Sequence, residues 1–406
     1  MPTSSSTFSS NPACHQSMQG KWALKHLGRA LTRQIHIPRP SRHDIPRQHS
    51  LRPAKHRLGA QHRTLFTESI PSIFVPPVIF TGLLVALWTW KCFWIIVLQD
   101  KLLYLSWLPP FSRSESISDY EREFRGVLWR QKQIQSLDSP ELAICEGRFP
   151  TQAVHHARRK RVVICYFQGN GGSTPLRLPL LSQVMSSIRE TGLAGEGDDT
   201  EYIVAALSYR GYWKSAGRAT QRGIELDART FVDWVTENYT APDTDLSIIL
   251  WGHSLGAAVA SATAVKYLSP AGCGPSGDGP AGSAKAPIKG LILEAPISSI
   301  KDMLISLYPQ KWLPYRYLWP FSWNNWDVAA SLEKMASLRS PPILLMSAGS
   351  DEVIPLWVAD QLEEKAKRLG LDVQRKNVNG AMHIEGPLKV DGRKALVEFI
   401  MGSRRK

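Results

Sequence analysis

One stretch decides the fold: Ser247-Ile248-Ile249-Leu250-Trp251-Gly252-His253-Ser254-Leu255-Gly256-Ala257-Ala258. An apolar run typical of a strand leads into Gly-x-Ser-x-Gly, and small residues typical of a helix follow. A sharp strand-to-helix turn strains the backbone of its central serine, and flanking glycines remove side chains that would clash. The context predicts that Ser254 is a nucleophile, beside a helix start that favours a developing oxyanion. The alternative is a Gly-Ser turn with a structural role only.

A nucleophilic serine needs a base, because its hydroxyl is not ionised at neutral pH. Where such a turn carries a catalytic serine, the partners follow in the order serine, acid, histidine. Beyond residue 157 the chain has two histidines, His253 and His383. His253 adjoins the serine inside the turn, so we expect its side chain to point away and pack. His383 follows the last predicted strand and is the predicted base.

The acid should end a strand between Ser254 and His383. Asp351 follows the predicted strand 342–347, and its expected role is to orient the imidazole and stabilise its protonated form. Glu352 is the second choice. Glu294 ends the strand before and is expected to be structural, whereas Asp327 is a candidate helix cap.

Strand-like runs alternate with helical ones over the second half of the chain. Strands are predicted at 161–167, 202–208, 246–251, 288–294, 342–347 and 371–378, and helices at 178–190, 221–238, 257–268, 356–369 and 393–401. Near-continuous apolar strands that alternate with helices indicate a parallel sheet covered on both faces. With the serine turn, this pattern predicts the α/β class and an alpha/beta-hydrolase fold, with a mostly parallel central sheet.

The oxyanion hole of such a site needs two backbone N–H groups. Leu255, after the nucleophile, is expected to supply one. The loop Gln168-Gly169-Asn170-Gly171-Gly172 follows the strand 161–167 and is expected to supply the other. Asn170 is the first choice and Gly169 the alternative. A phosphate cradle is not indicated, because neither Gly-x-Gly-x-x-Gly nor a P-loop lysine is present.

Positive charge gathers at the start of the chain. Residues 1–71 contribute +9 of the net charge of +14, and we interpret them as a basic disordered leader. Because the charge forms a tail and not a stripe with interleaved aromatics, we expect no nucleic acid as a partner. The leader is rich in arginine and serine and poor in acids, which is typical of a mitochondrial presequence. The alternative is a cytosolic tail with a short membrane-surface helix.

An apolar run at 73–98 predicts a single transmembrane anchor within residues 72–98. A span needs about 20 apolar residues. The run reaches that length if Pro76-Pro77 lie at one entrance and Lys91 extends to the interface at the other. The alternative is a hairpin in the interface. More basic residues precede the run than follow it, so the N-terminal side is expected in the cytosol and the rest across the membrane.

The remaining chain is predicted as a linker at 99–125 and a hydrolase domain at 126–406, with a cap inserted at about 297–336. Eight aromatic residues lie within 308–326. They are expected either to form a lid that contacts acyl chains or the membrane interface, or to be the core of the cap. The five scattered cysteines show no spacing for a disulfide framework or a zinc site, so no metal is expected.

Several motifs in order resemble one family. They are Tyr209-Arg210-Gly211-Tyr212, the turn Trp251–Gly256, Leu291–Pro296, and Asp351 with Pro355. Between about 160 and 400 the chain resembles membrane-bound alpha/beta-hydrolase domain proteins of the lysophosphatidylserine lipase and acylglycerol lipase group, with their fungal bud-emergence relatives. Members often have histidine where this chain has Gln168; because backbone groups form the oxyanion hole, activity is expected to survive this departure. The resemblance implies a single-pass protein with a lumenal hydrolase domain in the endoplasmic reticulum, and no cofactor.

These observations together predict a membrane-anchored serine hydrolase that cleaves carboxylic esters of acyl lipids through an acyl-serine intermediate, in the manner of a lysophospholipase or monoacylglycerol lipase. A thioesterase that removes palmitate from proteins would use the same triad and stays open. A non-catalytic membrane scaffold is the third reading. The compartment is expected to be the endoplasmic reticulum, with a mitochondrial membrane as the alternative.

Overall fold

The computed structural model describes residues 71–150, 159–194, 200–269 and 286–403. The predicted basic leader lies outside the described residues except for Pro71. We therefore describe the unit that begins at Pro71.

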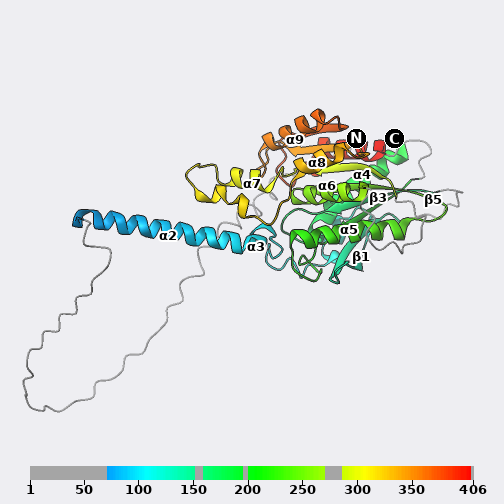
Figure 1. The fold of residues 1–406 in the computed structure, drawn as a ribbon. Helices are drawn as coiled ribbons and strands as arrows, with labels where there is room; N and C mark the ends of the chain where they lie inside the picture. The colour runs from blue at the N-terminus through cyan, green and yellow to red at the C-terminus, as the bar shows by residue number, and fades with distance from the viewer. Residues whose placement is uncertain (1–70, 151–158, 195–199, 270–285, 404–406) are drawn as a thin grey trace, which may run out of the picture. The chain divides into compact units, whose positions relative to one another are not determined.

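Eight strands form one sheet in the order β1-β2-β4-β3-β5-β6-β7-β8 (Figure 1). Their bounds are β1 Leu128–Gln135, β2 Glu141–Arg148, β3 Arg159–Phe167, β4 Glu201–Leu207, β5 Thr244–His253, β6 Ile288–Glu294, β7 Ile343–Ala348 and β8 Val373–Val378. β2 runs antiparallel to both of its neighbours, and the pairs from β4 to β8 are parallel. The sheet is therefore mixed and mostly parallel, as the sequence pattern predicts.

Helices cover both faces of this sheet, as Figure 1 shows. α5 (Gln221–Tyr239), α6 (Leu255–Leu268), α8 (Val328–Ala336) and α9 (Leu356–Arg368) bury apolar side chains in the core on one face. α4 (Leu178–Ala194) and α10 (Val390–Ser403) do so on the other. Along β5, Ile248 and Leu250 belong to the first core, and Ile249 and Trp251 to the second. The period-two alternation of a strand thus buries both faces of β5, whose end carries the serine turn.

The sequence pattern does not predict the hairpin of β1 and β2. β1 lies at the edge of the sheet, and most of its side chains are exposed. An edge strand with one face in water needs no apolar run, so its sequence reads as polar and irregular.

The segment 99–125, which we predict as a linker, packs on the domain. It contains the short helix α3 (Gln99–Leu103) and the 3₁₀ helix η2 (Ile117–Glu123). Tyr104 and Phe124 are buried, and Tyr104 belongs to the core on the α5 side of the sheet. Apolar residues are frequent between Leu102 and Leu108, and within the segment Tyr104 and Phe124 anchor it in the domain.

Helix α2 (Val75–Val97) follows a short 3₁₀ turn and covers the predicted anchor. It begins with a proline in its first turn, where the missing N–H costs no hydrogen bond. None of its residues is fully buried in the protein. By length and composition alone, Ser72–Val97 is long and apolar enough to cross a membrane.

The cap lies between β6 and α8. It comprises α7 (Ile300–Leu307) and the 3₁₀ turns η5 (Pro314–Tyr317) and η6 (Trp319–Phe321). α8 itself buries Leu332 and Met335 in the core of the sheet, so the insertion ends before the predicted residue 336. Asp327 accepts a hydrogen bond from Ala330 N at 2.8 Å and caps α8, as the sequence predicts.

Candidate active site

The serine turn joins β5 to α6. Ser254 has φ 54° and ψ −117°, a conformation that few residues other than glycine adopt. Its N–H donates to the carbonyl oxygen of Glu294 at 2.8 Å, which fixes the turn against the end of β6. This turn and its hydrogen bond therefore place Ser254 at the end of the sheet, at the start of α6.

Two glycines make this turn possible. A Cβ on Gly252 would overlap the backbone of Gly256, and a Cβ on Gly256 would overlap the backbone of Phe167 in β3. The Gly-x-Ser-x-Gly spacing is thus required by the close approach of helix, turn and neighbouring strand.

Asp351 and His383 contact each other directly. Nδ1 of His383 lies 2.9 Å and 3.0 Å from the two carboxylate oxygens of Asp351. The N–H groups of Val353 and Ile354 also donate to Asp351, at 2.8 Å and 2.7 Å. Burial alone would raise the pKa of Asp351, but the hydrogen bond from His383 and these backbone donors lower it on balance. Asp351 is therefore ionised at neutral pH and aimed at the histidine ring.

Glu352, the second choice for the acid, contacts the histidine differently. Its carboxylate accepts the backbone N–H of His383 at 3.0 Å and does not reach the ring in this structure. The geometry thus gives the two neighbouring carboxylates separate tasks, since Asp351 meets the imidazole and Glu352 holds the main chain of the loop.

His253 connects Ser254 to the histidine loop. Its Nε2 lies 3.2 Å from the carbonyl oxygen of His383, and the two imidazole centroids are 5.0 Å apart. Nη2 of Arg177 donates to Nδ1 of His253 at 2.7 Å, so the proton of His253 lies on Nε2 and donates to His383 O. Nη1 of Arg177 donates to the carbonyl oxygen of Ile384 at 3.3 Å.

Burial, and the nearby charges of Arg177 and His383, lower the pKa of His253 well below its usual value. His253 is therefore neutral at physiological pH and acts as a fixed hydrogen-bond bridge. Sequence reasoning expects this side chain to point away and pack. Its two ring nitrogens contact Arg177 and the carbonyl oxygen of His383, so this side chain holds the loop that carries His383. No motif predicts these contacts, because Arg177 and His383 both lie far from His253 in the sequence.

The glycine-rich loop after β3 lies beside the serine turn. Asn170, Ser254 and Leu255 line the same cavity. Gly169 approaches His253 so closely that a Cβ would lie 2.6 Å from its Nδ1. Oδ1 of Asn170 accepts the N–H of Leu105 at 2.8 Å. The loop predicted for the oxyanion hole and the residue after the nucleophile are thus brought together, and the predicted linker helps to hold the loop.

The turn after β4 supports this loop from inside the domain. Tyr209 donates its hydroxyl to the carbonyl oxygen of Gln168 at 2.9 Å. Gln168 in turn accepts from the Thr174 hydroxyl at 2.8 Å through its side chain. Gln168 is buried, so its side chain supports the loop from inside the domain.

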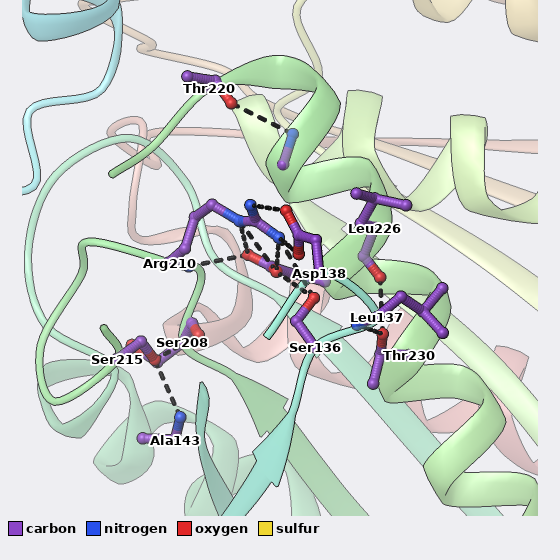
Figure 2. A network of polar contacts seen from close by, with 12 residues as sticks. Ser136, Leu137, Asp138, Ala143, Ser208, Arg210, Ser215, Thr220, Leu226 and Thr230 are labelled. Atoms are coloured by element: carbon purple, nitrogen blue, oxygen red, sulfur yellow. Dashed lines mark hydrogen bonds and ion pairs between the residues drawn. The ribbon is translucent and has the colours of Figure 1, made fainter. Parts of the chain in front are cut away.

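Arg210, next to Tyr209, joins three parts of the domain (Figure 2). Its guanidinium meets Asp227 of α5 at 2.6 Å and Asp138 of the β1–β2 turn at 2.7 Å. Asp227 is fully buried, and it also accepts the hydroxyl of Ser136 at 2.9 Å. The motif around Arg210 is therefore structural, because the guanidinium charge is paired with two carboxylates of the same domain.

Glu294 is a buried carboxyl group close to the serine turn. Its Oε2 accepts the indole N–H of Trp251 at 2.8 Å, whereas its Oε1 has no hydrogen-bond partner. Burial raises the pKa of Glu294 to about 7, against the opposing effects of Arg177 and the Trp251 hydrogen bond. Sequence reasoning expects a structural role here and does not foresee the perturbed pKa.

Ser254 and Leu255 line a cavity of about 430 Å³. Most of its other lining side chains are apolar and come from α2, α3, α7 and the segment after β7. Its size lies in the range of about 300–1,000 Å³ usual for ligand pockets. In the part of the chain that the structure describes, no cluster of three His, Cys, Asp or Glu side chains is placed to hold a metal ion.

The sequence of this chain is similar to those of several known proteins. Protein bem46 of Schizosaccharomyces pombe is 25% identical over 259 residues, which cover 63% of this chain and 71% of that protein. The lysophosphatidylserine lipase of Xenopus tropicalis is 30% identical over 244 residues, covering 58% of this chain and 51% of that protein. That of Danio rerio is 28% identical over 226 residues, covering 54% and 49%. The chain thus spans about half the length of these lipases.

Among solved structures, an esterase of Pyrococcus furiosus matches with a TM-score of 0.47 and 17% identity, over 71% of this chain and 93% of that one. Residues 185–383 match the model of the alpha/beta hydrolase family. That range includes Ser254, Asp351 and His383. The chain therefore has the alpha/beta-hydrolase fold, and its sequence is similar to the alpha/beta hydrolases that include bem46 and lysophosphatidylserine lipase.

Proposed function

We propose that this protein is a membrane-anchored serine hydrolase that cleaves carboxylic esters of acyl lipids. The observation that carries the proposal is the position of Ser254, which lies on a strained turn and lines an apolar cavity. A nucleophile beside an apolar cavity suits a substrate with a reactive ester and a long hydrocarbon chain. The lipase relatives support the same substrate class, since two of those compared are lysophosphatidylserine lipases.

In the proposed first step, Oγ of Ser254 attacks the ester carbonyl carbon while Nε2 of His383 takes its proton. Asp351 accepts the hydrogen bond of Nδ1–H, which keeps the other ring nitrogen free as a base and stabilises the protonated ring. The described contacts link Ser254 to His383 through His253, and the direct hydrogen bond forms as the substrate binds, since catalytic contacts tighten in the bound state.

The carbonyl oxygen becomes an oxyanion in this step. The N–H of Leu255, at the first turn of α6, has no acceptor within its own helix and is the first donor. Asn170 supplies the second N–H, with Gly169 as the alternative. His383 then gives its proton to the leaving alcohol, and an acyl-Ser254 remains. Water, activated by His383, attacks the acyl carbonyl and releases the fatty acid.

We propose that helix α2 anchors the enzyme as a single span, with the hydrolase domain on the lumenal side of the endoplasmic reticulum. One exposed apolar helix of sufficient length supports the span. A mitochondrial membrane is the alternative. Fractionation of cells that express the tagged full chain decides between the two, because the protein is expected to follow reticulum markers and not mitochondrial ones.

The substrate class is tested with purified full-length protein and a matched panel. The panel comprises a long-chain lysophospholipid, a long-chain monoacylglycerol and a palmitoylated peptide thioester, each with Ser254→Ala as control. The proposal predicts that the two oxygen esters are hydrolysed and that Ser254→Ala lowers the rates at least a thousandfold. Cleavage of the thioester alone would identify a depalmitoylating enzyme. Absence of all hydrolysis by a folded protein would favour a scaffold.

A further inference from the structure

The cavity at Ser254 has walls from three separate parts of the chain. Its lining residues come from the serine turn, from the cap, and from the last turn of the anchor helix with the segment after it. Ile95 and Ile96 come from α2, and Leu102 and Leu103 come from α3. A span that served only as a tether would have no reason to line the cavity of the nucleophile.

Buried hydrogen bonds fix the end of the anchor to the cap. Oδ1 of Asp100 accepts from the indole N–H of Trp323 at 3.0 Å and from Nδ2 of Asn324 at 2.8 Å. The hydroxyl of Tyr104 donates to Oδ1 of Asn324 at 2.7 Å and accepts from Nε1 of Trp326 at 2.8 Å. Asn324 and Tyr104 are almost fully buried, so the hydrogen bonds that these two residues make are shielded from water. The wall that α2 contributes is therefore held in place relative to the cap.

The cap also runs along the anchor. The rings of Trp88 and Trp312 are 6.1 Å apart, and the ammonium group of Lys91 lies 4.4 Å from the centre of the Tyr315 ring. Trp88 precedes the last residue of α2, Val97, by nine positions, or about 14 Å of helix. In an apolar layer of about 30 Å, this contact lies close to the middle.

The outer side chains of the cap suit such a place. Five of its large apolar residues are between 41% and 67% exposed, namely Trp312, Tyr317, Trp319, Phe321 and Trp323. Exposed apolar residues continue on α2 itself. Together they form an apolar surface. Its exposure to water is unfavourable, and lipid chains would cover it.

We infer that the cavity is an acyl-chain channel shared by the anchor and the cap, and that the last turn of α2 is part of the substrate site. A lipid whose chain stays in the apolar layer reaches Ser254 along Ile95 and Ile96 without its chain crossing water. The preferred substrates are accordingly long-chain acyl lipids that are presented in a membrane. This inference rests on the proposed ester hydrolase activity, and it adds that the span selects the substrate.

The test fills the channel from the anchor side. Ile96→Trp places a large side chain in the wall, and Val97→Trp, at an exposed neighbouring position that does not line the cavity, is the matched control. Leu102→Trp is a second channel variant, at a position that is half exposed and can take the larger side chain without loss of folding. Full-length proteins are reconstituted in phosphatidylcholine vesicles and assayed on a soluble butyrate ester and a long-chain monoacylglycerol.

Ile96→Trp and Leu102→Trp are expected to lower the ratio of the long-chain rate to the butyrate rate at least tenfold. Val97→Trp should match the wild type on both. Equal rates on the long-chain substrate for all four proteins, or equal losses on both substrates in the channel variants, would overturn the inference and leave the ester hydrolase standing. A folded wild type that cleaves neither ester and does not react with a fluorophosphonate would overturn the proposed function as well.

Discussion

The buried carboxyl group of Glu294 leads to a prediction about stability and pH. Its pKa is raised from 4.5 to about 7 in the folded protein, and only 2% of the residue is exposed. Between pH 4.5 and 7 the folded state holds a proton that the unfolded state has released, so stability falls as pH rises. Below and above this window the contribution is constant. At about 1.4 kcal/mol for each pH unit, the loss amounts to about 3 kcal/mol.

Glu294→Gln removes the ionisable proton and keeps an oxygen that can accept from Trp251. The variant should therefore be more stable relative to the wild type at pH 8 than at pH 4.5, by about 3 kcal/mol. For a domain of this size that is a difference in Tm on the order of 6 °C. Thermal unfolding of the detergent-solubilised full chain, at pH 4.5, 6 and 8, measures it.

Glu398→Gln is the control for this measurement, because the Glu398 side chain is 65% exposed and meets only Lys394 at 3.9 Å. Its difference from the wild type should stay within about 1 kcal/mol at every pH. If the Tm difference between Glu294→Gln and the wild type is the same at pH 4.5 and pH 8, the carboxyl group is not held neutral by burial, and the reasoning fails.

Three further predictions concern the site and its support. Asp351→Asn should lower kcat by about 10³–10⁴, because the amide no longer holds the tautomer of His383 that acts as a base, and ester assays at saturating substrate measure this. Arg210→Met should lower the free energy of unfolding by about 3–5 kcal/mol, since it leaves the Asp227 charge buried and unpaired, and denaturant titration would contradict this with a loss below 1 kcal/mol. Gly256→Ala should prevent accumulation of folded protein, because its Cβ would overlap a neighbouring backbone, and normal expression with full activity would refute that reading.

Local patterns carry much of the fold. The apolar run before Gly252 predicts β5, and the glycine spacing predicts the strained turn that places Ser254 at φ 54°. Chain order predicts a contact between Asp351 and His383, and the structure contains it at 2.9 Å. The catalytic roles of these three residues, and of Leu255, stay predictions.

Features that depend on distant parts of the chain escape sequence reasoning. The edge strand β1 is missed because its exposed residues carry no apolar signal. The bridge from Arg177 to His253 joins the end of the 3₁₀ helix η3 (Pro175–Arg177) to the end of β5, and no spacing in the sequence connects the two. The segment expected to be a linker packs on the domain, because Tyr104 is buried against Asn324, which lies 220 positions away in the sequence. Each of these features depends on how separate elements pack together, which hydrophobic periodicity does not predict.

The most direct measurement of the central claim is the site of covalent modification by a fluorophosphonate probe. Full-length protein in membranes is treated with the probe, digested and analysed by mass spectrometry. A single modified serine, Ser254, is predicted, with loss of the adduct in Ser254→Ala and retention in Ser261→Ala, whose hydroxyl is buried in α6 and bonded to Ala258 O. A folded protein without an adduct, or one modified at another serine, would contradict Ser254 as the nucleophile.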